Sequence, residues 1–264
     1  MNLWILKLGG SIITDKQSGK PIIEEERIKK LCSEIAAALQ QNQDLRLVVL
    51  HGAGSLGHPQ VKKYDLVNKP LTKERLLGMG ETMANMRLLT DKISEELRSK
   101  GVPALPLQTS SLLHVQGVEP ICTGIKTIKT ILKSGGVPVL GGDTVVTEDG
   151  RVVIASADML AMLLGRQCDA SRILFGSNVD GVYASFPPAD GEQPIKELTR
   201  QQAEDLSNTN QQNTSTIDVT GEMQGKLKAL LEMNDTQITI FNGKNQENLR
   251  AVLAGEAIGT VINL

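Results

Sequence analysis

Aromatic residues are scarce in this sequence: Phe, Trp and Tyr together make up 2% of its 264 residues. Proteins that bind single-stranded nucleic acid stack bases on such side chains, and nucleic-acid-binding domains carry an excess of positive charge. Here 28 basic residues are balanced by 30 acidic ones, which leaves a formal net charge of −2. The composition therefore argues against nucleic acid as a partner.

Cysteines and long apolar runs are also few. Cys32, Cys122 and Cys168 are far apart and odd in number, a pattern typical of reduced thiols in a core and not of a disulfide framework or a metal site. No apolar run approaches the roughly 20 residues of a membrane-spanning helix, and the chain starts on a predicted strand without the basic segment of a signal peptide. We therefore expect a cytoplasmic protein without membrane contact.

Apolar runs that end in glycine or polar residues predict the strands of a parallel sheet. They cover residues 3–8, 45–50, 102–107, 136–140, 151–154, 173–176, 238–241 and 260–262. Helical periodicity over 24–41, 76–97, 125–133 and 159–166 places amphipathic helices between them, as βαβ crossovers require. The stretch 186–216 is polar, and we expect much of it to be mobile because it has too little apolar content to pack.

The most informative stretch is HGAGSLGHP, residues 51–59, which follows the strand predicted at 45–50. Its glycines let backbone amides approach an anion, and His58 adds a side-chain donor, so the stretch predicts a phosphate-binding loop. Residues 52–57 also match the G-x-G-x-x-G pattern, which makes an NAD-dependent oxidoreductase a competing hypothesis. That fold needs an acidic residue at a strand end about 20 positions on. Glu74 instead leads into a helix.

Two lysines stand next to other glycine turns, and one aspartate follows a predicted strand. Lys7 interrupts an apolar strand, where an unpaired buried ammonium would cost several kcal/mol, so it needs a counter-charge or a ligand unless the strand lies at a sheet edge. Residues 221–226 resemble a P-loop that ends in Lys226 but is one residue short and lacks the Ser or Thr for Mg²⁺. Asp158 follows a strand and could cap a helix, position lysines or be a partner of Mg²⁺.

Such a set of lysines and backbone amides suits phosphoryl transfer, which mainly needs two repelling anions to be aligned and their charge offset. Met79, Met83 and Met86 recur along the predicted helix 76–97 and either pack in the core or line a slot for a hydrocarbon tail. His58 is either a structural residue or a phosphate donor. We interpret His51 and His114 as structural.

Several motifs occur in one order along essentially the whole chain: KLGGS at 7–11, Lys16, HGAGSLGH at 51–58, GD at 142–143, SAD at 156–158, NVDGVY at 178–183 and DVTGEMQGK at 218–226. This combination resembles the amino acid kinase superfamily, and the histidine that ends the second motif makes it most similar to the isopentenyl phosphate kinase family. The resemblance implies an α/β fold, an open three-layer αβα sandwich with a mainly parallel central sheet. It also implies an acceptor lobe, 1–165, and a nucleotide lobe, 166–264, that share the sheet, and a homodimer.

The resemblance further implies ATP- and Mg²⁺-dependent phosphorylation of isopentenyl phosphate in isoprenoid biosynthesis, with a fosfomycin kinase or another small-molecule kinase as the alternative. The catalytic residues would be Lys7, Lys16, His58, Asp158 and Lys226. ATP would contact Lys7, Gly9, Gly10, Ser11, Gly54, Asp180, Gly181, Tyr183, Thr220 and Lys226. The acceptor would contact Ala53, Gly54, His58, Ala157, Met83 and Met86, and no residue is predicted as a metal ligand. The chain departs from the family pattern at Leu56, Ala157, Asn178 and Glu222.

Overall fold

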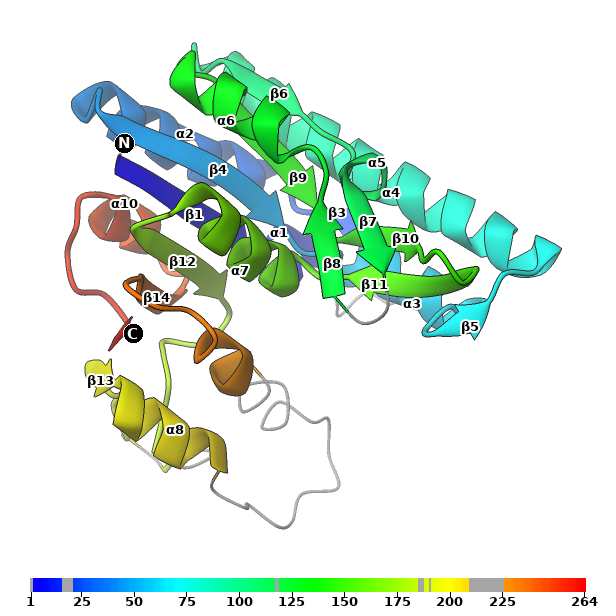
Figure 1. The fold of residues 1–264 in the computed structure, drawn as a ribbon. Coiled ribbons are helices and arrows are strands. Elements are labelled where there is room, and N and C mark those ends of the chain that lie inside the picture. The colour runs from blue at the N-terminus through cyan, green and yellow to red at the C-terminus, as the bar shows by residue number, and fades with distance from the viewer. Residues whose placement is uncertain (1, 16–20, 117–118, 185–187, 190, 209–225) are drawn as a thin grey trace.

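An eight-stranded sheet forms the middle of the molecule in the computed structural model, which describes residues 2–15, 21–116, 119–184, 188–189, 191–208 and 226–264 (Figure 1). Its order is β13 (Glu197–Thr199), β15 (Thr260–Asn263), β14 (Gln237–Asn242), β12 (Arg172–Ser177), β1 (Asn2–Leu8), β4 (Leu45–His51), β9 (Val137–Gly141) and β6 (Ala104–Pro106). Neighbouring strands pair in parallel except β14 and β15. The predicted mainly parallel sheet is therefore confirmed.

Helices cover both faces of this sheet. One layer contains α2 (Glu25–Gln41), α4 (Lys73–Arg98) and α10 (Asn248–Leu253), and the other contains α6 (Ile125–Lys133), α7 (Ala157–Cys168) and α8 (Arg200–Asn208). Each layer buries a separate apolar cluster against the sheet, because strand side chains alternate between the two faces. The predicted three-layer αβα sandwich is confirmed.

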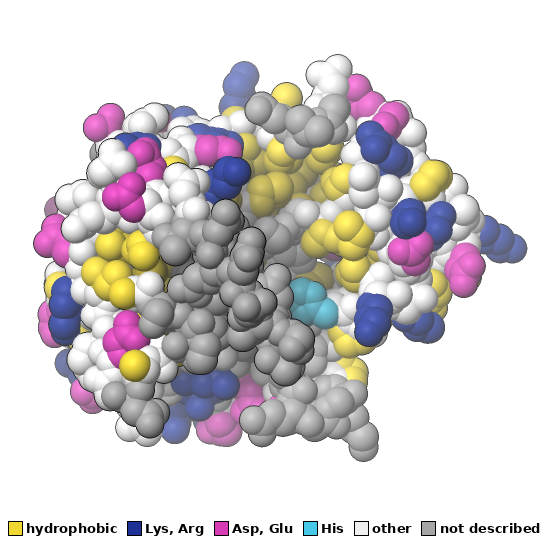
Figure 2. All heavy atoms as spheres, turned by 90° about the horizontal axis from the view of Figure 1, so that it is seen from below, with side chains coloured by type: hydrophobic (Ala, Val, Ile, Leu, Met, Phe, Trp, Pro, Cys, Tyr) yellow, Lys and Arg dark blue, Asp and Glu magenta, His cyan; other side chains and the backbone are white. Residues whose placement is uncertain are grey.

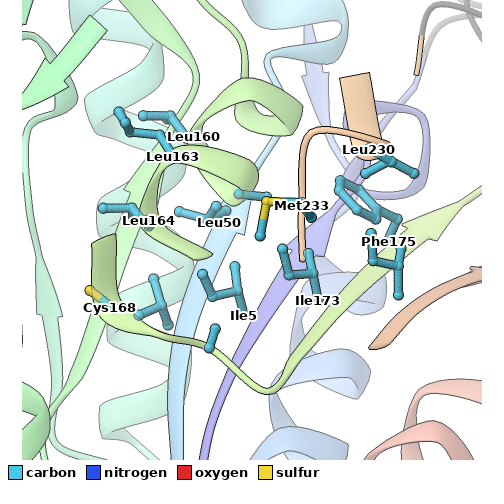
Figure 3. Close-up of a cluster of buried hydrophobic side chains, with 14 of the residues drawn as sticks. Ile5, Leu50, Leu160, Leu163, Leu164, Cys168, Ile173, Phe175, Leu230 and Met233 are labelled. Atoms are coloured by element: carbon cyan, nitrogen blue, oxygen red, sulfur yellow. The ribbon is translucent and has the colours of Figure 1, made fainter. Parts of the chain in front are cut away.

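The alternation along β1 determines where its lysine points. Leu3 and Ile5 belong to the cluster under α7, whereas Leu6 and Leu8 belong to the cluster under α2. Lys7 is two residues beyond Ile5 and therefore faces the α7 layer. Figure 3 shows Ile5 on this side among the leucines of α7.

Smaller elements extend the molecule beyond the sheet. The strands β10 (Asp143–Val146), β11 (Arg151–Ala155) and β5 (Lys69–Pro70) form a three-stranded antiparallel sheet, so the strand predicted at 151–154 lies outside the central sheet. The short helices are α1 (Gly10–Ile13), α3 (Gly54–Lys63) and α5 (Thr109–Leu112). The hairpins are β2 (Thr14–Asp15) with β3 (Ile22–Ile23), and β7 (Leu113–Gln116) with β8 (Glu119–Cys122).

The polar stretch 186–216 differs from the prediction in its middle part. Residues 197–208 form β13 and α8, and Leu198 and Ala203 from this segment are 2% and 1% exposed in the core. These two apolar contacts, together with pairing of β13 to β15, order a segment that composition alone marked as mobile. The predicted mobility of residues 209–216 falls outside the described residues.

Three other expectations concern the whole chain. The three cysteines are buried and free, as predicted. In the described part of the chain, no helix is both long and apolar enough to cross a membrane. Residues 1–165 and 166–264 both contribute strands to the central sheet. The division of the chain into an acceptor lobe and a nucleotide lobe stays a prediction.

Candidate active site

The carboxyl ends of the central parallel strands surround a cavity of ≈ 360 Å³. Ligands of open α/β sheets bind at such strand ends. Figure 2 shows hydrophobic side chains gathered around the hollow and a histidine at its edge. The predicted site residues that line the cavity are Lys7, Gly9, Gly10, Ser11, Ala53, Gly54, His58, Met86, Ala157, Asp158 and Lys226.

A charged triad occupies one end of this cavity. The Asp158 carboxylate lies 2.8 Å from the Lys7 ammonium and 3.2 Å from that of Lys226, and the two lysine side chains are only 11% and 9% exposed. Burial alone would raise the pKa of Asp158, but the two ammonium groups outweigh burial and hold the pKa below its usual value. The triad therefore carries one net positive charge, which suits an anionic ligand.

Each member of the triad comes from a different element. Lys7 is the second-last residue of β1, Asp158 lies in the first turn of α7, and Lys226 lies in a helical stretch whose described part covers 226–230. The helix cap that Asp158 could have formed is made by Ser156 instead, whose side chain accepts a hydrogen bond from the Met159 N–H at 3.1 Å. The Asp158 carboxylate is therefore available for the lysines.

Two glycine-bearing segments meet next to the triad. A side chain at Gly10 would collide with the backbone N of Gly54, and Gly54 itself has a φ of +51°. The Thr14 hydroxyl joins the segments, since it donates to the Gly10 carbonyl at 2.7 Å and accepts from the Ser55 N–H at 3.0 Å. This close approach presents the amino ends of α1 and α3 to the cavity, where backbone N–H groups favour a phosphate.

The segment predicted as a phosphate-binding loop is largely helical. Residues 54–63 form α3, so His58 lies inside a helix and its exposed side chain lines the cavity. Local propensity opposes a helix with two glycines and Pro59. The tertiary fold favours it, because Gly57 lets α3 pack closely on Met86 of α4.

His51, at the start of the same segment, is structural as predicted. Its ring is fully buried, and its Nε2 lies 2.7 Å from the Thr90 hydroxyl of α4. Burial lowers the pKa of His51 to about 4, so the imidazole is neutral at neutral pH. It anchors the end of β4 to α4.

The other end of the cavity is mainly apolar. Met86 lines this end, whereas Met83, also predicted to contact the acceptor, does not line the cavity. Sequence reasoning missed Val61, Val67 and Ile154, which also line this end. Val61 is three residues after His58, a spacing that places both on one helix face. This spacing identifies Val61 as a cavity residue only when residues 54–63 are known to be helical.

Asp143, of the GD motif at 142–143, is not among the predicted site residues, but it also lines the cavity. It is 4% exposed and accepts a hydrogen bond from Gln108 Nε2 at 2.5 Å and from the Thr144 N–H at 2.8 Å. Burial raises its pKa, and these donors partly offset the rise. The Asp143 carboxylate therefore links Gln108, which precedes α5, to Thr144 of β10.

Thr144, the next residue, has a buried hydroxyl with no hydrogen-bond partner in the described part of the chain. Leaving such a group unpaired costs about 1–3 kcal/mol. Replacing Thr144 with valine, which has nearly the same shape, is therefore expected to raise the free energy of unfolding by about 1 kcal/mol. Urea unfolding of the two proteins measures this difference, and a less stable valine variant would contradict the assignment.

Three predicted ATP-binding residues do not line the main cavity. Asp180 and Tyr183 line a second cavity of ≈ 280 Å³, together with Lys196 and Asn248. The Asp180 carboxylate accepts hydrogen bonds from Asn242 Nδ2 at 2.9 Å and Asn245 Nδ2 at 3.1 Å.

Gly181 is the third of these residues. It is buried against Thr260, whose hydroxyl accepts from the neighbouring Val182 N–H. Ser177, Asn178 and Val179, just before this motif, do line the main cavity. The predicted residues Lys16 and Thr220 lie outside the described residues. Among the side chains that the structure describes, no group of three His, Cys, Asp or Glu residues could hold a metal ion.

Comparison with known proteins places this geometry in a family. Residues 2–242 match the model of the amino acid kinase family. The isopentenyl phosphate kinases of Methanocaldococcus jannaschii and Methanothermobacter thermautotrophicus are 32% and 30% identical to this chain, over 99% and 96% of it and 98% and 96% of their own lengths. A solved structure described as "X-ray structures of isopentenyl phosphate kinase" superposes with a TM-score of 0.81 at 27% identity, covering 98% of this chain and all of that one. These relatives are kinases, so the dinucleotide-binding interpretation of residues 52–57 is not supported. The chain therefore belongs to the amino acid kinase family and, within it, to the isopentenyl phosphate kinases.

Proposed function

We propose that this protein transfers the terminal phosphoryl group of ATP to isopentenyl phosphate and so forms isopentenyl diphosphate and ADP. The observation that carries the proposal is the composition of the main cavity. One end joins a net positive lysine–aspartate triad to two glycine segments, and the other has Val61 and Met86 in its walls. A phosphate monoester with a hydrocarbon tail matches both ends.

The residues nearest the triad would bind the phosphates. Lys7 and Lys226 would hold the ATP phosphates, with the backbone N–H groups of the two glycine segments, while Asp158 holds the two lysines in position against their mutual repulsion. Lys16 would stabilise the transferring phosphoryl group. The remaining nucleotide contacts would come from Asp180, Gly181, Tyr183 and Thr220, and the acceptor contacts from Ala53, His58 and Ala157.

The reaction needs little covalent help from the protein. A phosphate monoester has a second pKa near 6 and is largely a dianion at neutral pH, so its oxygen can attack the terminal phosphorus of ATP without a general base. The bond from that phosphorus to the bridging oxygen breaks, and ADP leaves with the electron pair. The chain's own contribution is to align the two anions and offset their charge.

Mg²⁺ would neutralise charge on the ATP phosphates. The chain fits such an ion, because Mg²⁺ in kinases is held largely by substrate phosphates and water and needs only one or two carboxylates. Asp143 and Asp158 are the described carboxylates that line the cavity and could supply such a ligand. No cage of protein ligands is required.

Two further expectations remain proposals. Leu76, Leu77 and Leu88 of α4 are between 52% and 61% exposed, which favours a self-association surface and supports a homodimer. Light scattering at several concentrations measures the oligomeric state. The cytoplasmic location also stays a prediction.

An ADP-release assay tests the proposed function. Isopentenyl phosphate is expected to give sustained turnover, whereas acetylglutamate and UMP are expected to give none. A fosfomycin kinase is the second candidate, because its phosphonate acceptor would also use His58, but the apolar walls favour a hydrocarbon tail over that compact polar molecule. Turnover with fosfomycin and none with isopentenyl phosphate would reverse this ranking.

His58 provides a test of the acceptor end. Replacing His58 with alanine removes a charge-assisted hydrogen bond to the acceptor phosphate, and such bonds contribute about 1.5–3 kcal/mol. We expect kcat/KM for isopentenyl phosphate to fall roughly tenfold to a hundredfold. ATP binding, measured by calorimetry, should change little. An unchanged kcat/KM would remove His58 from the acceptor site.

A further inference from the structure

The apolar end of the main cavity leads away from the predicted phosphate position along one helix. His58 and Val61 are three residues apart on α3, so both lie on the same face, about 4.5 Å apart along the helix axis. Met86 of α4, 2% exposed, lines the same part of the cavity. An acceptor phosphate at His58 would therefore place its hydrocarbon tail between Val61 and Met86.

This end of the cavity opens at an apolar mouth. Val67 and Ile154 both line the cavity, yet they are 57% and 36% exposed. Large apolar side chains that both line a cavity and are partly exposed lie where the cavity meets the protein surface. Val67 and Ile154 therefore form an apolar rim at this end.

The apolar surface also continues beyond the mouth. Thr144 and Ile154 face each other across β10 and β11, and the next pair on the same sheet face is Val146 with Val152. Val146 is 43% exposed and does not line the cavity. It therefore extends the apolar track from Ile154 toward the outside.

The backbone around Val67 is built to hold this residue at the mouth. Asp65 and Asn68, on either side, have φ angles of 47° and 53°, and Leu66 between them is fully buried. The Asn68 N–H donates to the Val152 carbonyl at 2.9 Å, and Arg75 Nε donates to the Asp65 carbonyl at 3.2 Å. The exposure of Val67 is thus imposed by an anchored turn.

We infer that this site accepts phosphate monoesters whose hydrocarbon chain is longer than isopentenyl, and that the chain leaves the cavity between Val67 and Ile154. The inference rests on the proposed function, since it places the acceptor phosphate at His58. An isopentenyl tail beside Val61 and Met86 would leave the mouth and Val146 in water. A longer chain would cover them, and binding strengthens with the apolar area removed from water.

Steady-state kinetics with isopentenyl phosphate and geranyl phosphate test the inference. We expect the unmodified protein to phosphorylate both, with kcat/KM values within about tenfold of each other, a difference of 1.4 kcal/mol. In Val67→Asp, kcat/KM for geranyl phosphate should fall tenfold or more, while that for isopentenyl phosphate should change less than about threefold. Val67→Leu should preserve both.

Ile121→Asp is the matched control, because it places the same charge on another exposed apolar residue outside the cavity. It should leave the ratio of the two kcat/KM values unchanged. Calorimetry adds a binding readout: the heat-capacity change should be more negative for geranyl phosphate, and Val67→Asp should remove that difference.

The outcomes separate the two proposals. Turnover of isopentenyl phosphate without turnover of geranyl phosphate would overturn the longer-chain inference and leave the proposed function intact. Equal losses for both acceptors in Val67→Asp would overturn the path between Val67 and Ile154. Failure of both acceptors with the unmodified protein would overturn the proposed function itself.

Discussion

Replacing Asp158 with asparagine is expected to lower the rate of ADP release with isopentenyl phosphate by about a hundredfold or more. The Asp158 carboxylate lies between the ammonium groups of Lys7 and Lys226, at 2.8 and 3.2 Å. Unit charges 4 Å apart interact by about 4 kcal/mol at an effective dielectric constant of 20, so removing the anion leaves two lysines that repel each other and move from their positions. Steady-state kinetics at saturating substrates measure the loss.

Asp149→Asn serves as the control for this variant. It also removes a carboxylate in an ion pair, but its partner Arg151 and the turn that carries both residues are exposed and outside the cavity. ADP release should therefore stay close to that of the unmodified protein. Asp158→Asn with full activity, or equal losses in the two variants, would contradict the role given to Asp158.

The same residue predicts a dependence of stability on pH. The pKa of Asp158 in the folded protein is lowered, because the two lysines outweigh the effect of burial. Its charge therefore stabilises the fold at neutral pH, and this contribution is lost only as the pH falls through the folded-state pKa. The difference in free energy of unfolding between the unmodified protein and Asp158→Asn should be constant above about pH 5 and shrink below it. A difference that grows with acidity would contradict this sign.

Replacing Gly10 with alanine is expected to lower kcat/KM by about a hundredfold, although no charge is removed. The new methyl group would collide with the backbone of Gly54, so the two glycine segments would have to separate. A shift of about 1 Å in a positioning element is enough for a loss of this size. The measurement is kcat/KM for isopentenyl phosphate, together with ATP binding by calorimetry.

Gly80→Ala is the matched control for Gly10→Ala. Gly80 is an exposed residue of α4, and a side chain there would meet nothing within 4 Å. Alanine at this helical position should raise the free energy of unfolding by about 0.4–1 kcal/mol and leave kcat/KM unchanged. If Gly10→Ala also kept its kcat/KM, the close approach of the two segments would have no role in catalysis.

The regular elements were largely predictable because each depends on a short local pattern. The apolar run at 3–8 and the periodicity over 24–41 were enough for β1 and α2. Lys7 was also recognisable in this way, since a lysine in a buried strand requires a partner. Lys7 lies on the same face of the sheet as Leu3 and Ile5, and this determines which helix layer its side chain faces.

Helix α3 was not predictable in the same way. Two glycines and Pro59 give residues 54–63 a poor helix propensity. The helix forms because Gly57 permits close packing on Met86, a contact that local sequence does not contain. The same contact places His58 and Val61 on one wall of the cavity.

The sequence by itself determined the strands, the residue types that end them and the family to which the motifs belong. Only the tertiary structure decided which of those residues share a cavity. Lys226 reaches Lys7 through Asp158, whereas Asp180 is held away by Asn242 and Asn245. The physical reason is that strand order brings residues together across the sheet, and this order does not follow separation along the chain.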